Sequence, residues 1–333
     1  MKALVTGGGG FLGGAIAKLL LSKGAQVRSF SRRDYPALAK LGVEGLSGDL
    51  KDKEAVSAAC AGRDTVFHVA AKVGMWGRYS DFYEANVDGT TNLLEAAKAA
   101  GVSRFIFTSS PSVVFAGGDA EGWDETAPYP ARFDSYYAET KARAEQLVLA
   151  ANSPGFATVA LRPHLVWGPG QDHLVSGIVA KGRAGRIRRI GNFNKLIDTT
   201  YIDDAAAAHW QAAEKLAPGS ACAGKAYFIS QGDPRPNWDI INMILAAAGI
   251  GPAVKAIPYG PAFAAASALE AAWRLAGIKS EPPLTRFIVQ QLTTAHWFDI
   301  SAARRDLGYN PAVTIEQGMK RLEAWFRSGS PAY

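Results

Sequence analysis

The sequence predicts an α/β fold in which helices cover both faces of a doubly wound parallel sheet, with a smaller region at the C-terminus. The first observation is a short apolar run at residues 2–6 that ends abruptly in a glycine cluster. The second is a helical pattern over Phe11–Ser22, followed by an apolar run over Gln26–Phe30. Together these segments form a strand, glycine turn, helix and strand, which is a βαβ unit. The third observation is that the alternation continues to about residue 165.

The later elements of this region follow from the same patterns. Thr65–Ala70 and Arg104–Thr108 are apolar runs typical of buried parallel strands. A long helical pattern near Phe82–Ala100 lies between them. Ser135–Asn152, rich in alanine, glutamate, lysine and leucine, predicts a further helix, and Ala157–Arg162 predicts the strand after it.

The pattern loosens after residue 165, where glycine, proline and tryptophan turns interrupt it. The tail ends in an amphipathic helix near Thr314–Phe326. We therefore expect residues 1–165 to form a core dinucleotide-binding domain, with later strands interleaved to about residue 230. Residues 166–333 are expected to form mostly a smaller, substrate-binding region.

Composition excludes several classes of protein. The chain has 333 residues, of which 48% are apolar and 20% charged, and this excludes disordered, collagen-like and coiled-coil proteins. The two cysteines, Cys60 and Cys222, cannot form a disulfide scaffold, and neither has a second ligand at metal-binding spacing, so we expect no metal site. The N-terminus reaches glycine before a signal-length apolar run develops, which predicts a cytoplasmic protein.

A glycine-rich segment, Thr6–Gly13, follows the first strand and opens the first helix. Glycine suits this place because the chain must turn tightly and approach a pyrophosphate without a Cβ in the way. The helix N-terminus also directs free N–H groups and the positive end of its dipole toward the anion. This context predicts dinucleotide binding, with Gly7, Gly10 and Gly13 as contacts.

The end of the second strand indicates which dinucleotide is bound. An acidic residue at this place would bond a ribose 2′-hydroxyl. Here the chain reads Ser31, Arg32 and Arg33, with no carboxylate before Asp34. Arginines can bind a 2′-phosphate, so the sequence favours NADP(H), with NAD(H) as the alternative. Asp49 stands where an acceptor for the adenine amino group would be useful, and a plain turn residue is the other interpretation.

Tyr137 and Lys141 stand four residues apart on the helix that we expect to begin near Asp134, so they share one face. A phenol with a pKa of about 10 is a poor acid or base at neutral pH, and a nearby cation favours its anion. We therefore expect Lys141 to lower the pKa of Tyr137. Ser110 follows the strand at Arg104–Thr108, at the sheet edge where doubly wound folds bind ligands. The three side chains predict a proton-transfer site in which Ser110 bonds a substrate carbonyl.

The motifs and their order resemble the extended short-chain dehydrogenase/reductases, and within them the 3β-hydroxysteroid dehydrogenase/isomerase-like family. The resemblance implies a Rossmann fold. It runs through the first half of the chain and continues weakly at Gly224–Tyr227 and Arg305–Tyr309. The matching stretches are Thr6–Gly13, Gly48–Leu50, His68–Ala71, Asn86–Thr90, Thr108–Val113, Tyr137–Lys141, Arg162–His164 and Trp167–Pro169.

The resemblance implies roles for the matching residues. Tyr137 would be the general acid/base, Lys141 would also hold the nicotinamide ribose, and Ser110 would orient the substrate oxygen. Asn86 matches the asparagine that helps organise the family's active site. Further cofactor contacts are implied for Phe11, Leu12, Leu50, Ala70, Pro163 and His164, the last two where the chain passes the nicotinamide carboxamide.

The implied activity is that of an NAD(P)-dependent oxidoreductase that interconverts a secondary alcohol and a ketone on a lipidic substrate. Two groups look closest: the sterol 4-carboxylate 3-dehydrogenases and the bacterial 2-alkyl-3-ketoalkanoate reductases. Both substrates carry a carboxylate beside the reacting centre, and the sequence leaves the choice between them open. A homodimer is common in relatives and is expected. A nucleotide-sugar epimerase or dehydratase, and a catalytically silent NADP(H)-sensing protein, are the alternatives.

The formal charge of +6 has its source in one segment, residues 173–197, which contains six cations and no acidic residue. The cations are Lys181, Arg183, Arg186, Arg188, Arg189 and Lys195. The segment is interpreted either as a solvated basic face or as the source of a cation that pairs with a substrate carboxylate. Aromatic residues do not alternate with the charges, which argues against nucleic-acid binding.

Residues 257–278 are largely apolar and predict a helix that contains Glu270 and Arg274. These charges and the high alanine content make the segment too weak for a transmembrane span. Three interpretations remain open: a lid over a lipid chain, a peripheral contact with a membrane surface, or a plain packed helix.

Overall fold

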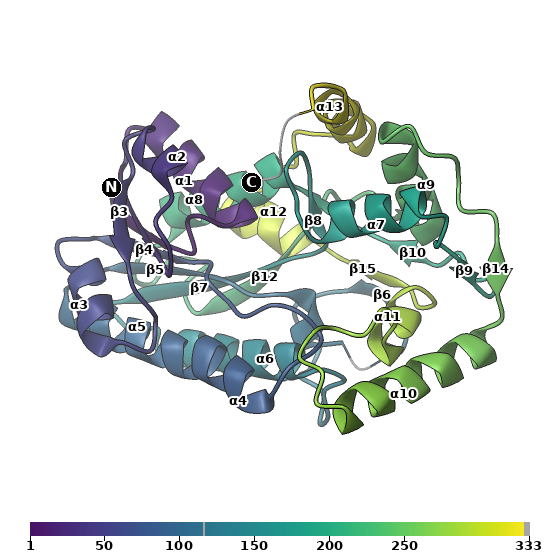
Figure 1. Ribbon diagram of the computed structural model, residues 1–333. Helices are drawn as coiled ribbons and strands as arrows, with labels where there is room; N and C mark the ends of the chain where they lie inside the picture. The colour runs from purple at the N-terminus through teal and green to yellow at the C-terminus, as the bar shows by residue number, and fades with distance from the viewer. Residues whose placement is uncertain (116, 330–333) are drawn as a thin grey trace.

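A seven-stranded parallel sheet forms the centre of the computed structural model (Figure 1). The structure describes residues 1–115 and 117–329, so the last four residues of the predicted 166–333 region lie outside the described part. The strand order is β12-β7-β5-β4-β1-β2-β3, and every neighbouring pair is parallel. The strands are β1 Lys2–Thr6, β2 Gln26–Ser31, β3 Glu44–Ser47, β4 Thr65–His68, β5 Arg104–Thr108, β7 Ala157–Pro163 and β12 Lys225–Ile229. The predicted doubly wound parallel sheet is confirmed.

Helices cover both faces of this sheet. Helices α1, α8 and α12 pack together on one face, and α3, α5 and α6 lie on the other (Figure 1). Their bounds are α1 Phe11–Ser22, α3 Lys53–Cys60, α5 Gly89–Ala99, α6 Tyr136–Ala150, α8 Ile202–Lys215 and α12 Ser301–Leu307. The chain builds β2 and β3 on one side of β1 and then crosses to β4, so the strand order reverses between β1 and β4. Doubly wound folds bind ligands at the carboxyl ends of the strands at such a point.

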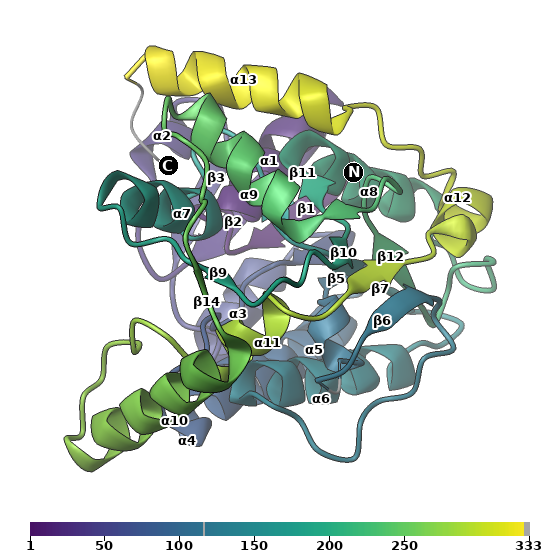
Figure 2. The same cartoon turned by 90° about the vertical axis from the view of Figure 1, so that its right-hand side faces the viewer.

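Most of the remaining elements form a second layer. It contains a four-stranded sheet in the order β13-β10-β15-β6. Figure 2 shows α13 along the top of this layer and α10 extending away from the body of the molecule. The strands are β6 Ala120–Trp123, β8 Val166–Trp167, β9 Arg189–Ile190, β10 Leu196–Ile197, β11 Thr200–Tyr201, β13 Arg235–Pro236, β14 Ala256–Ile257 and β15 His296–Phe298. The helices of this layer are α7 Leu174–Arg183, α9 Asn237–Ala247, α10 Tyr259–Leu275, α11 Arg286–Gln291 and α13 Ile315–Arg327. Two short helices belong with the main sheet: α2 Pro36–Ala39 contacts β3, and α4 Tyr79–Tyr83 contacts α6.

The structure differs from the sequence prediction at a few elements. The predicted strand at Thr65–Ala70 ends at His68, because the N–H of Ala70 turns to the Thr6 hydroxyl (3.1 Å). β3 was not predicted, since Glu44–Ser47 is a largely exposed edge strand without an apolar run. The long helix predicted near Phe82–Ala100 begins earlier and contains a π-helical segment. The division of the chain near residue 165 stays a prediction, and β12 is a late strand within the main sheet.

A buried ion pair ties α6 to the sheet. The Arg162 guanidinium, at the end of β7, donates to both carboxylate oxygens of Glu145 on α6, at 2.6 and 3.0 Å. The two side chains are 3% and 0% exposed, and the Tyr129 hydroxyl donates to the same carboxylate at 2.7 Å. Burial of two charges is tolerated only where each satisfies the other, so neither residue can be lost alone without cost.

We predict that Arg162→Met lowers the free energy of unfolding by about 3–5 kcal/mol, because it leaves the Glu145 carboxylate buried without its cation. The double variant Arg162→Met/Glu145→Leu should recover most of this loss, since an apolar pair replaces the ionic one. Urea unfolding followed by circular dichroism measures both values. A double variant as unstable as the single one would contradict this account of the ion pair.

Candidate active site

A glycine cradle lies between the end of β1 and the start of α1. Gly7 has a φ of +69°, in the left-handed region that favours glycine. A Cβ on Gly7 would lie 3.0 Å from the backbone of Ala70, and one on Gly13 would lie 2.2 Å from the Gly7 carbonyl oxygen. The N–H of Gly10, the residue that caps α1, donates to the same carbonyl (2.9 Å). The turn is therefore compact, and its open side at the helix N-terminus fits a pyrophosphate.

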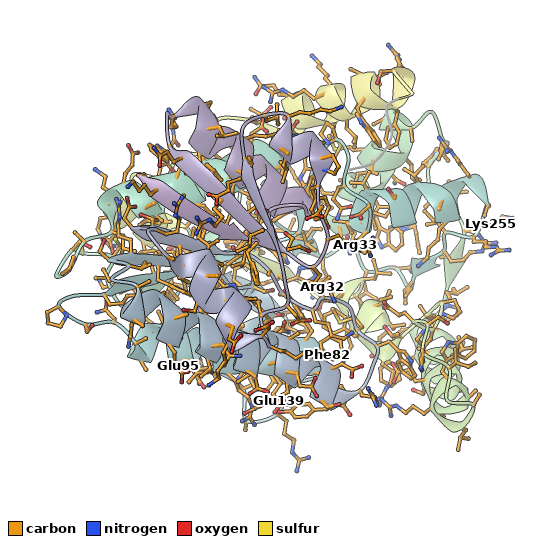
Figure 3. The ribbon with its side chains drawn as sticks, turned by 60° about the vertical axis from the view of Figure 1, so that its left-hand side comes forward. Arg32, Arg33, Phe82, Glu95, Glu139 and Lys255 are labelled. Atoms are coloured by element: carbon orange, nitrogen blue, oxygen red, sulfur yellow. The ribbon has the colours of Figure 1, made fainter. Side chains whose placement is uncertain are left out.

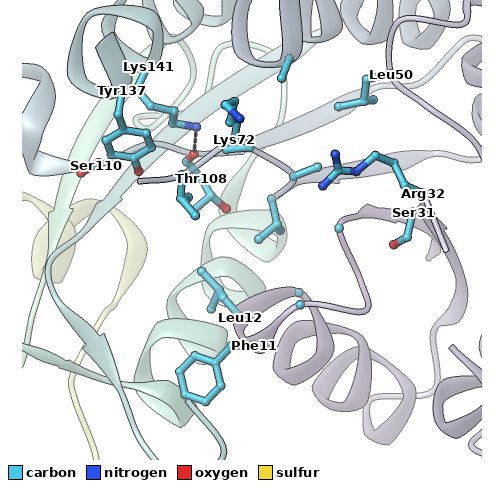
Figure 4. Close-up of a pocket in the computed structure, with 18 of the residues that line it drawn as sticks. Phe11, Leu12, Ser31, Arg32, Leu50, Lys72, Thr108, Ser110, Tyr137 and Lys141 are labelled. Atoms are coloured by element: carbon cyan, nitrogen blue, oxygen red, sulfur yellow. Dashed lines mark hydrogen bonds between the residues drawn. The ribbon is translucent and has the colours of Figure 1, made fainter. Parts of the chain in front are cut away.

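A cavity of about 920 Å³ opens beside this cradle along the carboxyl ends of the strands (Figure 4). Most of the site residues predicted from the sequence line this cavity. They are Gly7, Gly10, Phe11, Leu12, Gly13, Ser31, Arg32, Asp49, Leu50, Ala70, Ser110, Tyr137, Lys141 and Pro163. The structure thus brings the candidate cofactor contacts and the candidate proton-transfer residues into one cavity.

A buried hydrogen-bond network fixes the loop after β4 against β1. The Thr6 hydroxyl accepts from the N–H of Ala70 and lies 2.8 Å from Nδ1 of His68. Nε2 of His68 lies 2.8 Å from the Thr90 hydroxyl, which donates to a backbone carbonyl one turn earlier. Nε2 is therefore assigned as the protonated nitrogen, and Nδ1 accepts from Thr6. Burial lowers the pKa of His68 to about 3, so the ring is neutral at physiological pH.

The end of β2 provides two exposed arginines. Arg32 and Arg33 both line the cavity, and Figure 3 shows them on the same side of the molecule as Phe82. Within residues 1–115 and 117–329, no carboxylate lies at ion-pair distance from either guanidinium. Asp49 accepts the N–H of Lys51 at 3.0 Å, which is the geometry of a turn residue. Its contact with adenine stays a prediction.

Tyr137 lies in the first turn of α6, which begins at Tyr136 after the Ser135 hydroxyl caps the helix. Its phenol lies next to Ser110 in the cavity (Figure 4). The Ser110 hydroxyl oxygen accepts from the N–H and the hydroxyl of Ser112, at 3.2 and 3.0 Å, which fixes the Ser110 side chain. Burial raises the pKa of the Tyr137 phenol, and the Ser110 hydroxyl offsets part of this rise. The phenol is therefore protonated at neutral pH.

This result corrects the expectation that Lys141 lowers the pKa of Tyr137. The Lys141 ammonium donates to the Thr108 carbonyl oxygen at 2.6 Å and lies 3.9 Å from the centroid of the Phe107 ring (Figure 4). Burial lowers the pKa of Lys141 to about 7, and Glu145, one turn further along α6, acts in the opposite direction. Loss of water around both groups is the larger effect, because it penalises the charged form of each.

Asn86 and His164 are not among the described residues that line the cavity. The Asn86 side chain is buried behind its wall, where it joins the backbone of Lys72 to Thr140 on α6. His164 is buried beside Asp198, with Nδ1 2.6 Å from a carboxylate oxygen. A role of Asn86 in organising the site and a contact of His164 with the nicotinamide carboxamide stay proposals.

The cavity also contains residues that the sequence analysis did not select, among them Lys72, Thr108, Leu165 and His173. Lys72 directly follows the matching stretch His68–Ala71, so its position was a usable signal. Leu165 has a φ of 41°, an uncommon value for a bulky residue, where the chain leaves β7. This backbone geometry has no signature in the sequence.

Among the described residues that line the cavity, none is a lysine or arginine of the basic segment 173–197. Among the described lining residues, only His173 comes from residues 173–197. Lys195 pairs with Asp119 at 2.5 Å, and the Arg189 guanidinium lies 5.8 Å from the centroid of the Trp238 ring. The interpretation in which a cation of this segment pairs with a substrate carboxylate therefore has no support from the geometry, and the interpretation as a solvated basic face stays open.

Known proteins match the chain over nearly its whole length. The model of the 3-beta hydroxysteroid dehydrogenase/isomerase family matches residues 4–256. A 2-alkyl-3-oxoalkanoate reductase of Stenotrophomonas maltophilia is 50% identical over 327 residues, which cover 97% of this chain and 99% of that protein. A decarboxylating sterol-4-alpha-carboxylate 3-dehydrogenase of Mus musculus is 34% identical, over 96% of this chain and 89% of that protein.

Solved structures share the fold. The crystal structure of gox2253 superposes with a TM-score of 0.79 at 28% identity and covers 100% of this chain and 99% of its own. The UDP-glucose 4-epimerase of Thermus thermophilus, solved in complex with NAD, gives a TM-score of 0.75 at 25% identity over 99% and 100% of the two chains. The glycine cradle, the cavity and these matches agree, and the chain belongs to the 3-beta hydroxysteroid dehydrogenase/isomerase family of nicotinamide-dependent oxidoreductases.

Proposed function

We propose that this protein is an NADP(H)-preferring ketoreductase that interconverts the ketone of a 2-alkyl-3-oxo acid and the corresponding secondary alcohol. The observation that carries the proposal is the placement of Ser110 and Tyr137 in the same cavity as the glycine cradle. The named activity of the Stenotrophomonas maltophilia relative, at 50% identity, supports the choice of substrate. The sterol acids named for the Mus musculus relative are the second candidate, at 34% identity.

The bound nicotinamide would supply or accept the hydride. The chain's own residues would handle the substrate oxygen and its proton. Because burial keeps the Tyr137 phenol protonated, it can donate a proton to the ketone oxygen during reduction. Ser110, held by Ser112, would donate a hydrogen bond to the same oxygen and set its position. Lys141, with a pKa lowered to about 7, can exchange a proton near neutral pH and so support the return of the phenol to its acid form.

The preference for NADP(H) rests on Arg32 and Arg33. Both side chains border the cavity after β2, where a 2′-phosphate on the adenosine ribose would need positive charge. No acidic residue of the described chain pairs with either arginine, so the positive charge is not neutralised by a direct partner. A carboxylate at this position would instead favour a ribose 2′-hydroxyl.

A nucleotide-sugar epimerase or dehydratase shares the scaffold but fits the site less well. Dehydratases of that type need an acidic residue beside the strand-end hydroxyl, whereas Ser110 is followed by Pro111 and Ser112. A silent NADP(H) sensor would not need Ser110, Tyr137 and Lys141 together in one cavity. We therefore retain the reductase as the proposal.

A homodimer and a peripheral membrane contact are further expectations for this protein. In the described part of the chain, no helix combines the length and apolar character that a membrane crossing requires. Helix α10 nevertheless carries exposed apolar side chains, including Leu275, which is 90% exposed. The lid, the membrane contact and the packed helix all stay as interpretations of this segment.

We predict that Tyr137→Phe lowers kcat for reduction of a 2-alkyl-3-oxo acid about 10²- to 10⁴-fold, because the proton donor is lost. Affinity for NADPH should stay near the wild-type value. Tyr136→Phe is the matched control, since this neighbouring tyrosine is half exposed and does not line the cavity. Steady-state kinetics and fluorescence titration with NADPH provide the measurements. Equal loss of turnover and of NADPH binding would count against an acid/base role for Tyr137.

We predict that Arg32→Ser raises KM for NADPH roughly 10- to 100-fold, because a hydrogen bond to a charged group contributes about 1.5–3 kcal/mol. KM for NADH should change little, which makes NADH the internal control. Initial rates measured with both cofactors give the ratio. The same loss with NADPH and NADH would show that Arg32 does not recognise a 2′-phosphate.

A further inference from the structure

Lys72 is rigidly placed at the wall of the cavity. Its N–H donates to Oδ1 of Asn86 at 2.7 Å, and its carbonyl oxygen accepts from Nδ2 of the same side chain at 3.1 Å. The Asn86 amide also donates to the Thr140 hydroxyl at 3.0 Å. Thr140 lies on α6 between Tyr137 and Lys141, so one buried amide sets the position of Lys72 relative to these two residues.

The side chain of Lys72 extends along an aromatic surface. Its Nζ lies 5.1 Å from the centroid of the Phe82 ring, and that buried ring lies 6.4 Å from the ring of Tyr136. Gly77 packs closely on the same ring, since a Cβ there would lie 3.2 Å from Phe82. Lys72 is therefore held near the start of α6, and Figure 4 shows it in the cavity wall next to Lys141 and Thr108, on the side away from Tyr137.

Each of the other lysines and arginines that line the cavity either has a partner or lies after β2. Lys51 pairs with Glu84 at 3.1 Å, Lys141 is bonded to a backbone carbonyl, and the two arginines follow β2. Over the described ranges of the chain, no carboxylate lies at ion-pair distance from the Lys72 ammonium. Its acidic neighbour Asp81 is engaged by Arg78 at 2.9 Å. Lys72 thus offers a positive charge in the cavity wall, on the loop that Asn86 joins to α6.

We propose that Lys72 binds the carboxylate of the acidic substrate and so makes the enzyme prefer a free acid to its ester. This inference rests on the proposed function, since it concerns the same substrate. In a 2-alkyl-3-oxo acid the carboxylate is separated from the ketone carbon by one carbon. A cation near the start of α6 can therefore hold the carboxylate while the ketone oxygen faces Ser110 and Tyr137. An ester lacks the charge and loses this contact.

The test compares Lys72→Met with the wild type in the oxidation of a 2-alkyl-3-hydroxy acid and of its methyl ester by NADP⁺. Methionine keeps an unbranched stem against Phe82. We expect the variant to raise KM for the acid roughly 10- to 100-fold and to leave kcat/KM for the ester unchanged. Lys72→Arg should restore much of the preference for the acid. Lys320→Met, an exposed lysine on α13, is the control and should behave as the wild type.

Separate outcomes would overturn the inference. If Lys72→Met lowers kcat/KM for acid and ester by the same factor, Lys72 does not recognise the carboxylate. If instead the variant binds NADP⁺ more weakly in a titration without substrate, Lys72 acts on the cofactor. Thermal unfolding of Lys72→Met shows whether a loss of activity comes from misfolding. In that case, the acid and ester kinetics of Lys72→Arg are compared with those of the wild type. Turnover of neither compound by the wild type would overturn the proposed function, and this inference with it.

Discussion

Removal of water from one face of α6 is the constraint on which the site depends. Tyr137, Lys141 and Glu145 lie one turn apart on this face; Lys141 and Glu145 are buried against the sheet, and Tyr137 is half-buried in the cavity wall. Burial penalises the charged form of a group, so it keeps the phenol protonated and weakens the ammonium. Glu145 is buried on the same face, but its carboxylate forms an ion pair with the buried Arg162 guanidinium. The same helix face therefore holds two groups whose pKa values burial shifts and one carboxylate in a buried ion pair.

The position of this face relative to the cofactor cradle is set by small polar contacts. Thr6, His68 and Thr90 join β1, β4 and the start of α5 beneath the cavity. Asn86 then connects the loop after β4 to α6. Because each of these groups is buried and satisfied, the network has few alternative arrangements. It holds the glycine turn after β1, the proposed pyrophosphate site, and the helix that carries Tyr137 as one unit.

Much of this arrangement could be predicted from the sequence, for physical reasons. Parallel strands are apolar throughout and helices are periodic, so β1, α1 and β5 have the expected bounds. Fourteen of the selected residues line one cavity because strand ends gather at the sheet's switch point. The direction of the Tyr137 pKa shift could not be predicted, because spacing along a helix reveals neither burial nor the Thr108 carbonyl that accepts from Lys141. The position of Lys72 directly after a matching stretch could have marked it for attention, but its contacts with Phe82 and Asn86 could not be predicted, because they form only when the chain folds.

In the proposed reaction, a hydride passes in this cavity between a nicotinamide and the ketone carbon of a 2-alkyl-3-oxo acid. The most direct test is to reduce such an acid with the protein and NADPH that is fully deuterated at C4 of the nicotinamide. We predict a product with one deuterium, on the carbon that bears the new hydroxyl group, as seen by mass spectrometry and NMR. A reduced product without deuterium at that carbon would contradict the account.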